Sequence, residues 1–93
     1  MNLTASDQGL SIIRVDDLRQ AFIQFNTHDT CDVILKVMSE EDKEVRMLLN
    51  EALVKGSHSV GFNFGALSGT YNIRLVINTI DAIVIETKQI KID

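Results

Sequence analysis

The sequence contains one cysteine, one tyrosine and no tryptophan, and these scarcities exclude several kinds of domain. Cys31 has no partner for a disulfide within the chain, so the fold is not cross-linked in that way. It lies in an apolar run, where we expect it to be a buried small hydrophobic residue. Carbohydrate binding is disfavoured, because sugar rings stack on aromatic platforms that this composition does not supply. The phenylalanines occupy positions typical of a core, and they are Phe22, Phe25, Phe62 and Phe64.

Basic residues are also few. Nine lysines and arginines stand against thirteen aspartates and glutamates, for a formal net charge of −4, and no segment holds three basic residues together. Nucleic-acid binding depends on clustered Lys and Arg that neutralise phosphates, so this composition opposes it. No stretch approaches the ~20 apolar residues that a membrane span requires. Residues 1–7 do not form a signal peptide. We therefore expect a soluble chain with no membrane span and no export signal at its front.

What the sequence does contain is a succession of short runs rich in isoleucine and valine. The chain is 45% hydrophobic and 24% charged, as globular domains are, and 93 residues suffice for one domain. The run from Tyr71 to Asn78 alternates between apolar and polar side chains, which is the period of a half-buried strand. We predict strands over residues 10–15, 21–27, 31–38, 44–50, 58–64, 70–78 and 81–92.

Turn residues separate these runs about every ten residues, and the links are short, as between antiparallel strands. This recurrence predicts an all-β fold, a seven-stranded antiparallel immunoglobulin-like β-sandwich over residues 10–93. Residues 1–9 are polar and aperiodic, and we expect them to form a flexible arm or linker.

A helix over residues 45–54 is the alternative for one segment, because Val45, Leu48, Leu49 and Ala52 have partial helical spacing. Strands fit the surrounding hairpin spacing better. The predicted core comprises Ile23, Phe25, Val33, Leu35, Val37, Leu48, Val60, Phe62, Tyr71, Ile73, Leu75 and Val84.

Histidines are the first candidates for chemistry, and there are two. His28 lies in a turn beside Asp29, where hydrogen-bonded turn chemistry is the expected role, and His58 opens a strand. Two histidines and one cysteine give no recognised zinc spacing. The acidic run at residues 40–44 has no glycine-centred calcium loop, so we expect a solvated turn. We therefore predict no catalytic residue, no metal site, no cofactor and no enzymatic activity.

Several motifs of the chain follow one another in an order known from one family. After an apolar strand pair within residues 21–37, the segment 44–49 (EVRMLL) stands where that family reads "Gly, any, Val, any, any, Leu". Residues 67–75 then read "Leu, Ser, Gly, any, Tyr, any, any, Arg, Leu", and the last strand carries Lys88 and Lys91. Residues 56–62 match "Gly, any, His or Tyr, any, Val, any, Trp or Phe". From Ala21 to Asp93 the chain resembles the C-terminal sorting domains of type IX secretion cargo, and the related immunoglobulin-type module of the flagellar hook-cap scaffold.

The resemblance implies a domain that is recognised and does no chemistry. Its partner would be the outer-membrane type IX secretion machinery, with a sortase-like enzyme that cuts in the linker before the fold. The residues that would be recognised are Gly69, Tyr71, Lys88 and Lys91. From the residues alone, Gly69 can supply a positive φ where the chain turns sharply, and Tyr71 can bury its ring while its hydroxyl reaches the edge. Without the resemblance, the two lysines are more typical of edge charges that discourage aggregation than of a recognition site.

A second class of function stays open. A free-standing interaction or scaffold module would offer an exposed strand edge to a protein partner, and pairing of two copies through an edge is one form of it. The expected cellular location depends on which of these functions the domain has. A sorting domain of a larger exported protein would be secreted or held at the cell surface, whereas a complete 93-residue product would be cytoplasmic.

Overall fold

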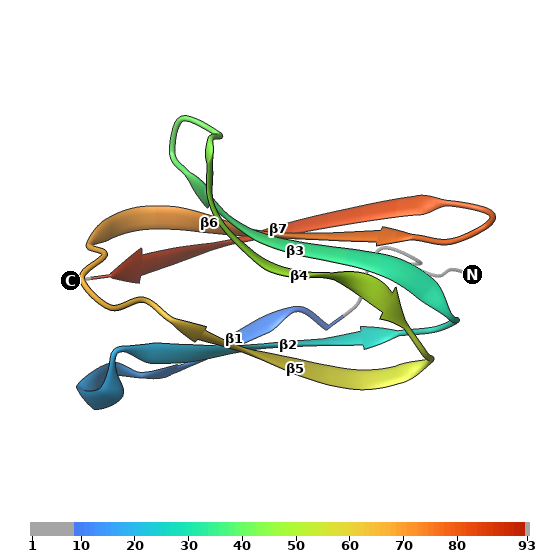
Figure 1. Cartoon of the computed structure of the whole chain (residues 1–93), viewed down its shortest axis with the longest axis horizontal. Coiled ribbons are helices and arrows are strands. Elements are labelled where there is room, and N and C mark those ends of the chain that lie inside the picture. Colours follow the sequence, from blue (N-terminus) through green and yellow to red (C-terminus); the bar gives the residue numbers. More distant parts are fainter. Residues whose placement is uncertain (1–8, 93) are drawn as a thin grey trace.

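The computed structural model describes residues 9–92, which form seven strands in two antiparallel sheets (Figure 1). The elements are β1 (Ser11–Val15), a turn of 3-10 helix η1 (Asp16–Leu18), β2 (Gln20–Thr27), β3 (Cys31–Ser39), β4 (Glu44–Leu53), β5 (Gly56–Asn63), β6 (Gly69–Asn78) and β7 (Ile83–Ile92). The predicted strands are confirmed, each within a few residues of its expected bounds. The arm predicted at residues 1–9 lies outside the described residues except for Gly9, which precedes β1.

The two sheets form the layers of a sandwich. One has the strand order β1-β2-β5 and the other the order β4-β3-β6-β7, with every neighbouring pair antiparallel. The links from β2 to β3, from β4 to β5 and from β5 to β6 cross from one layer to the other, as in immunoglobulin-like sandwiches (Figure 1). The all-β sandwich predicted from the sequence is therefore confirmed.

Residues 45–54 are not helical, so the alternative for that segment is wrong. All of them except Val54 belong to β4, whose register against β3 shifts between Leu35 and Lys36 and again between Val37 and Met38. Leu49 lies opposite Leu35 and Met47 opposite Lys36, which leaves Leu48 as an extra residue in a β-bulge. Leu48 and Leu49 are therefore both half-buried. Two adjacent inward leucines imitate helical spacing in the sequence.

The core lies between the inner faces of the two sheets, where alternate residues of each strand meet. Of the predicted core, Leu48, Val60, Tyr71 and Val84 are half-buried and pack against it, and the others are fully buried. Cys31 is buried, as predicted. Further buried residues, absent from the predicted core, are Leu10, Ala21, Thr27, Met38, Phe64, Ile77, Ile90 and Ile92.

Phe22 is not a core residue, which corrects one expectation. Its neighbours Ala21 and Ile23 face the core, so alternation turns Phe22 to the outer face of the three-stranded sheet, where it is 38% exposed. Phe22 lies opposite Gly61 in β5, and its ring is 3.7 Å from where a Cβ on that glycine would be. The aromatic ring thus covers the glycine of the neighbouring strand.

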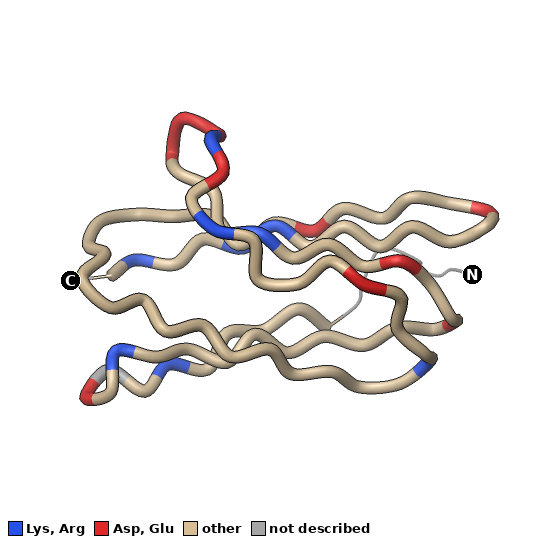
Figure 2. The backbone as a smooth tube through the Cα atoms, viewed as in Figure 1, with Lys and Arg blue, Asp and Glu red and all other residues tan. Residues whose placement is uncertain are grey.

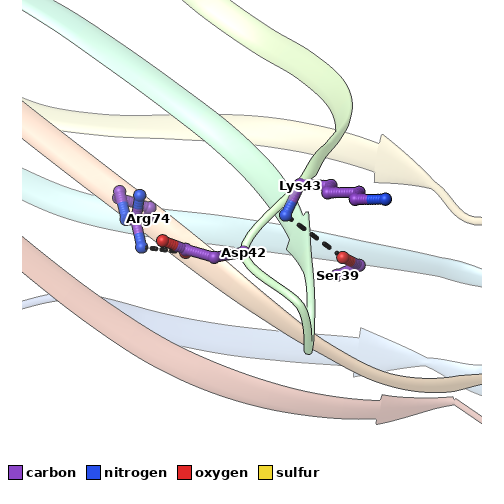
Figure 3. Close-up of polar contacts among 4 residues, drawn as sticks. All are labelled: Ser39, Asp42, Lys43 and Arg74. Atoms are coloured by element: carbon purple, nitrogen blue, oxygen red, sulfur yellow. Dashed lines mark hydrogen bonds and ion pairs between the residues drawn. The ribbon is translucent and has the colours of Figure 1, made fainter.

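The acidic turn between β3 and β4 folds over the outer face of the four-stranded sheet. Asp42 adopts φ +66°, a conformation that Asp tolerates better than most residues, and its N–H donates to the Ser39 carbonyl at 3.0 Å. The Lys43 N–H donates to the Ser39 hydroxyl at 3.2 Å, and the Asp42 carboxylate pairs with Arg74 on β6 (Figure 3). Arg74 lies directly opposite Lys36, and Lys36 pairs with Glu44 at 3.0 Å. The turn and the first residue of β4 therefore each supply a carboxylate to one of two basic side chains that would otherwise repel across the strands.

Candidate functional site

The pairing of β6 with β7 brings Gly69, Tyr71 and Lys91 to one end of the four-stranded sheet and leaves Lys88 near the middle of β7. Gly69 lies opposite Ile92 and Tyr71 opposite Ile90. Lys91 lies opposite Thr70, and Lys88 lies opposite Ile73. In Figure 1 this is the end where β6 begins and β7 runs out toward the C-terminus. Residues about twenty positions apart in the sequence thus meet on neighbouring strands.

The two lysines nevertheless leave β7 on opposite faces. Lys88 pairs with buried Ile73 and so projects from the inner face, where its ammonium group donates to the Leu10 carbonyl at 2.9 Å. Lys91 is three residues further along, so its side chain projects from the outer face. They do not make one basic patch. Figure 2 likewise shows lysines and arginines distributed over several strands.

Gly69 and Tyr71 shape the entry into β6. Gly69 has φ +106°, a region that L side chains rarely adopt, and this agrees with the positive φ expected for it. No atom lies within 4 Å of where a Cβ on Gly69 would be, so backbone conformation and not space calls for glycine. The half-buried Tyr71 packs against the core, and its hydroxyl donates to the Ser68 carbonyl at 2.9 Å. Both residues hold the turn that precedes the strand.

Strand β7 is an edge strand, and its backbone direction can be assigned. The Arg14 guanidinium, on the opposite sheet, donates to the Lys91 carbonyl at 2.5 Å, so Lys91 directs its carbonyl away from β6. In a regular antiparallel strand the N–H and C=O of one residue point to the same side, and successive residues alternate. The register of β7 against β6 has no shift from Ile83 to Ile92. Ile83, Ile85, Thr87 and Gln89 therefore direct their backbone N–H and C=O outward, and we call these groups the free edge.

Two exposed isoleucines lie on the free edge. Ile83 is 64% and Ile85 60% exposed, on the outer face of the sheet. Ile85 lies opposite Val76, which lies opposite Ile34, so an apolar row crosses three strands and ends at the edge. Within residues 9–92, no hydrogen bond to the free edge is found beyond the β6–β7 pairing.

A shallow groove separates β7 from β1 of the other sheet. Its lining consists of Ser11, Ile12, Arg14, Lys88, Gln89, Ile90 and Lys91. Arg14 and Lys88 cross this groove with their bonds to Lys91 and Leu10. The last residues of β7 are thereby tied to the other layer, whereas Ile83 and Ile85 extend beyond the groove.

His58 is held in structural contacts, and Cys31 is buried. His58 lies against the ring of Phe25, and its Nε2 is 2.9 Å from the Val54 carbonyl and 3.1 Å from the buried Thr27 hydroxyl. Burial raises the pKa of the Cys31 thiol, and the nearby carboxylates Asp32 and Asp29 raise it further. The thiolate, which is the nucleophilic form, is therefore disfavoured at Cys31.

Residues 9–92 hold no cluster of metal ligands and no helix suited to cross a membrane. No three His, Cys, Asp or Glu side chains in this range converge as metal ligands would. The same range contains no helix long and apolar enough to cross a membrane.

Comparison with known proteins identifies the fold and no family. No family model matches the chain, and neither does any curated protein. Among solved structures, the chain is similar to Parabacteroides merdae β-glucuronidase with glycerol in its active site, with a TM-score of 0.55 and 16% identity. The match covers 92% of this chain and 13% of the enzyme, so the chain spans a small part of that enzyme's length. A likeness at this identity supports the β-sandwich and nothing finer.

Proposed function

We propose that this domain is a non-catalytic recognition module that binds a protein partner along the free edge of β7. The observation that carries the proposal is the unbroken ten-residue edge strand, whose outward N–H and C=O groups lie beside the exposed Ile83 and Ile85. An extended segment of a partner can add to such an edge as a further strand, with backbone hydrogen bonds giving affinity and alternate side chains giving specificity.

The other edges of the sandwich favour such pairing less. β1 has five residues and β4 carries two register shifts, which twist a strand and interrupt its pattern of bonds. The end of β5 is covered by Arg46, which donates to the Asn63 carbonyl and lies 5.3 Å over the Phe62 ring. Length and regularity together single out β7.

A synthetic strand tests the proposal. The probe is a ten-residue extended peptide with Lys placed opposite Glu86 and Glu opposite Lys88, so that both inward charges of β7 are matched. We expect its titration to shift the NMR amide signals of Ile83, Ile85, Thr87 and Gln89 most strongly. Peptide binding that shifts β4 or β5 instead, or no binding at all, would contradict the proposal.

A proline supplies the matched control. Thr87→Pro removes an outward N–H and places a ring where the incoming strand must approach, without removing a hydrogen bond to β6. We expect it to stay folded and to lose peptide binding. Thr87→Ala should bind as the parent does.

Type IX sorting is the second candidate function. The match of residues 67–75 to the sorting-domain pattern favours it, together with the convergence of Gly69, Tyr71 and the lysine-bearing β7 at one end of the sheet. On this proposal the outer-membrane secretion machinery recognises that end, and the protein carrying the domain is secreted or held at the cell surface. The free-standing module remains the alternative, in a cytoplasmic location.

The sorting proposal is tested by fusing residues 1–93 behind an exported reporter in a bacterium with a type IX system. Secretion of the reporter supports it, and retention in the periplasm contradicts it. Lys91→Glu should reduce secretion strongly, because the Lys91 side chain projects from the outer face of the sheet, next to the free edge. The control is Lys43→Glu, which reverses a charge in the distant β3–β4 turn.

A further inference from the structure

Strand β7 carries two charged side chains on the face that it turns toward the core. Val84, Glu86, Lys88 and Ile90 project inward, since they lie opposite the buried residues Ile77, Leu75 and Ile73 and the half-buried Tyr71. Inward charges on an edge protect it, because an added strand that places like charges or apolar side chains opposite them is disfavoured. They also select the partner that does match them.

We infer that a second copy of this chain matches them, and that two β7 strands pair antiparallel about a two-fold axis at Thr87. In this register Glu86 of each copy lies opposite Lys88 of the other. Val84 of each copy lies opposite Ile90 of the other. On the inner face, the two charged pairs at the centre are therefore flanked on each side by an apolar pair. The inference deepens the proposed function by naming the partner at the free edge.

Backbone geometry allows this register. The outward N–H and C=O groups belong to odd-numbered residues, so hydrogen-bonded pairs must join odd residues to odd residues. An axis at Thr87 joins Thr87 to Thr87 and Ile85 to Gln89, which gives about six backbone hydrogen bonds. These bonds leave the contact between Arg14 and the Lys91 carbonyl in place. The result is one continuous sheet built from the four-stranded sheets of both copies.

Charge disfavours the neighbouring symmetric registers. An axis moved by one residue places Glu86 opposite Glu86 or Lys88 opposite Lys88, and like charges directly opposite are destabilising. An axis moved by two residues, to Ile85 or Gln89, places Glu86 and Lys88 opposite apolar residues. The axis at Thr87 is the register near the middle of β7 in which each charge meets its opposite.

Sedimentation of the full 93-residue chain tests the inference first. A single strand pair is a small interface, so concentrations should run from about 10 μM to about 1 mM. We expect a reversible monomer–dimer equilibrium in this range. A chain that remains monomeric throughout overturns the inference. If that monomer still binds the synthetic strand at β7, the recognition module stands without the second copy.

Charge reversal tests the register. Glu86→Lys and Lys88→Glu each place two like-charged pairs in the interface, and we expect each to weaken the dimer roughly 10- to 100-fold. A 1:1 mixture of the two variants pairs Lys with Glu at every position, so it should form the heterodimer with near-parent affinity. Recovery in the mixture also shows that both variants are folded. Variants that dimerise like the parent, or a mixture that does not recover, would overturn the register.

A cysteine at the axis gives an independent readout. Cα atoms of a hydrogen-bonded pair are about 5.5 Å apart, within the span of a disulfide, so Thr87→Cys should cross-link two copies in an oxidising glutathione buffer. The matched control is Gln89→Cys, whose symmetry mate is displaced by about 13 Å along the strand. Equal cross-linking of the two variants would contradict the two-fold axis at Thr87. Cys31 is buried and should not cross-link in either variant.

Discussion

The two outer strands of the four-stranded sheet, β4 and β7, have the same length and opposite designs. Each has ten residues. β4 is interrupted twice in its register, and the turn before it folds back over the sheet through the Asp42–Arg74 pair. β7 is regular throughout, and its protection consists of the inward Glu86 and Lys88. An irregular edge disfavours pairing with any added strand. A regular edge with inward charges disfavours pairing with every strand except one whose charges are complementary.

Strand β7 has an anchored end and an exposed part. Substituting one isoleucine in each part should give the largest difference in unfolding free energy among these predictions. Ile90 is 3% exposed, and Ile90→Ala should lower the free energy of unfolding by ~2–4 kcal/mol, because it leaves a cavity in the core. Ile85→Ala should change it by less than ~0.5 kcal/mol. Urea unfolding followed by circular dichroism measures both. Equal losses would mean that β7 is uniformly anchored.

The junction of β6 with the end of β7 is tested by a pair of glycines. Gly69→Ala forces a side chain onto φ +106° and should cost ~1–3 kcal/mol. Gly61→Ala should be close to neutral, since its Cβ would make ordinary contact with the Phe22 ring. Thermal unfolding of both variants gives the comparison. A neutral Gly69→Ala would show that the turn into β6 does not require glycine.

The β4–β5 corner depends on a buried hydroxyl. Thr27 is 3% exposed and donates to the Val54 carbonyl at 2.9 Å. Thr27→Val keeps the shape and removes the hydrogen bond, so we expect a loss of ~1–2 kcal/mol in the free energy of unfolding. Thr30→Val, at an exposed turn position, is the control and should lie within ~0.5 kcal/mol of the parent. A stable Thr27→Val would show that the corner is held by packing alone.

The smallest effect is expected in the turn before β4. Asp42→Asn keeps a side chain that tolerates positive φ and removes the charge that pairs with Arg74. The pair is largely exposed, so we expect a loss of ~0.2–1 kcal/mol that shrinks in high salt. Glu40→Gln, in the same turn, should have no salt-dependent effect. Denaturant unfolding at low and high salt measures the difference, and a loss independent of salt would contradict the ion pair.

The sequence predicts the strands well because alternation and turn residues are local signals. It misplaces Phe22, although the parity of Ala21, Ile23 and Phe25 in the same strand indicates an outward side chain. In β7 the parity is ambiguous, since Ile83 and Ile85 are odd-numbered whereas Ile90 and Ile92 are even-numbered. The inner face, and with it the inward direction of Lys88, is therefore fixed by pairing with β6.

The position of an edge is a property of long-range pairing. The lysines within residues 83–92 are typical of an edge strand, but they do not fix its position, because the strand order follows from which partners each run finds across the sheet. The sequence therefore predicts a lysine-bearing last strand, and the fold adds that this strand has one neighbour and that its lysines diverge. The recognition role of Gly69, Tyr71, Lys88 and Lys91 stays a prediction.

Native-state hydrogen exchange along β7, measured by NMR at low protein concentration, tests the free edge most directly. The account predicts alternation: slow exchange at Val84, Glu86, Lys88 and Ile90, whose N–H groups bond to β6, and fast exchange at Ile83, Ile85, Thr87 and Gln89. Uniform protection of all these amides in the dilute monomer would contradict it, because the edge would then already be covered.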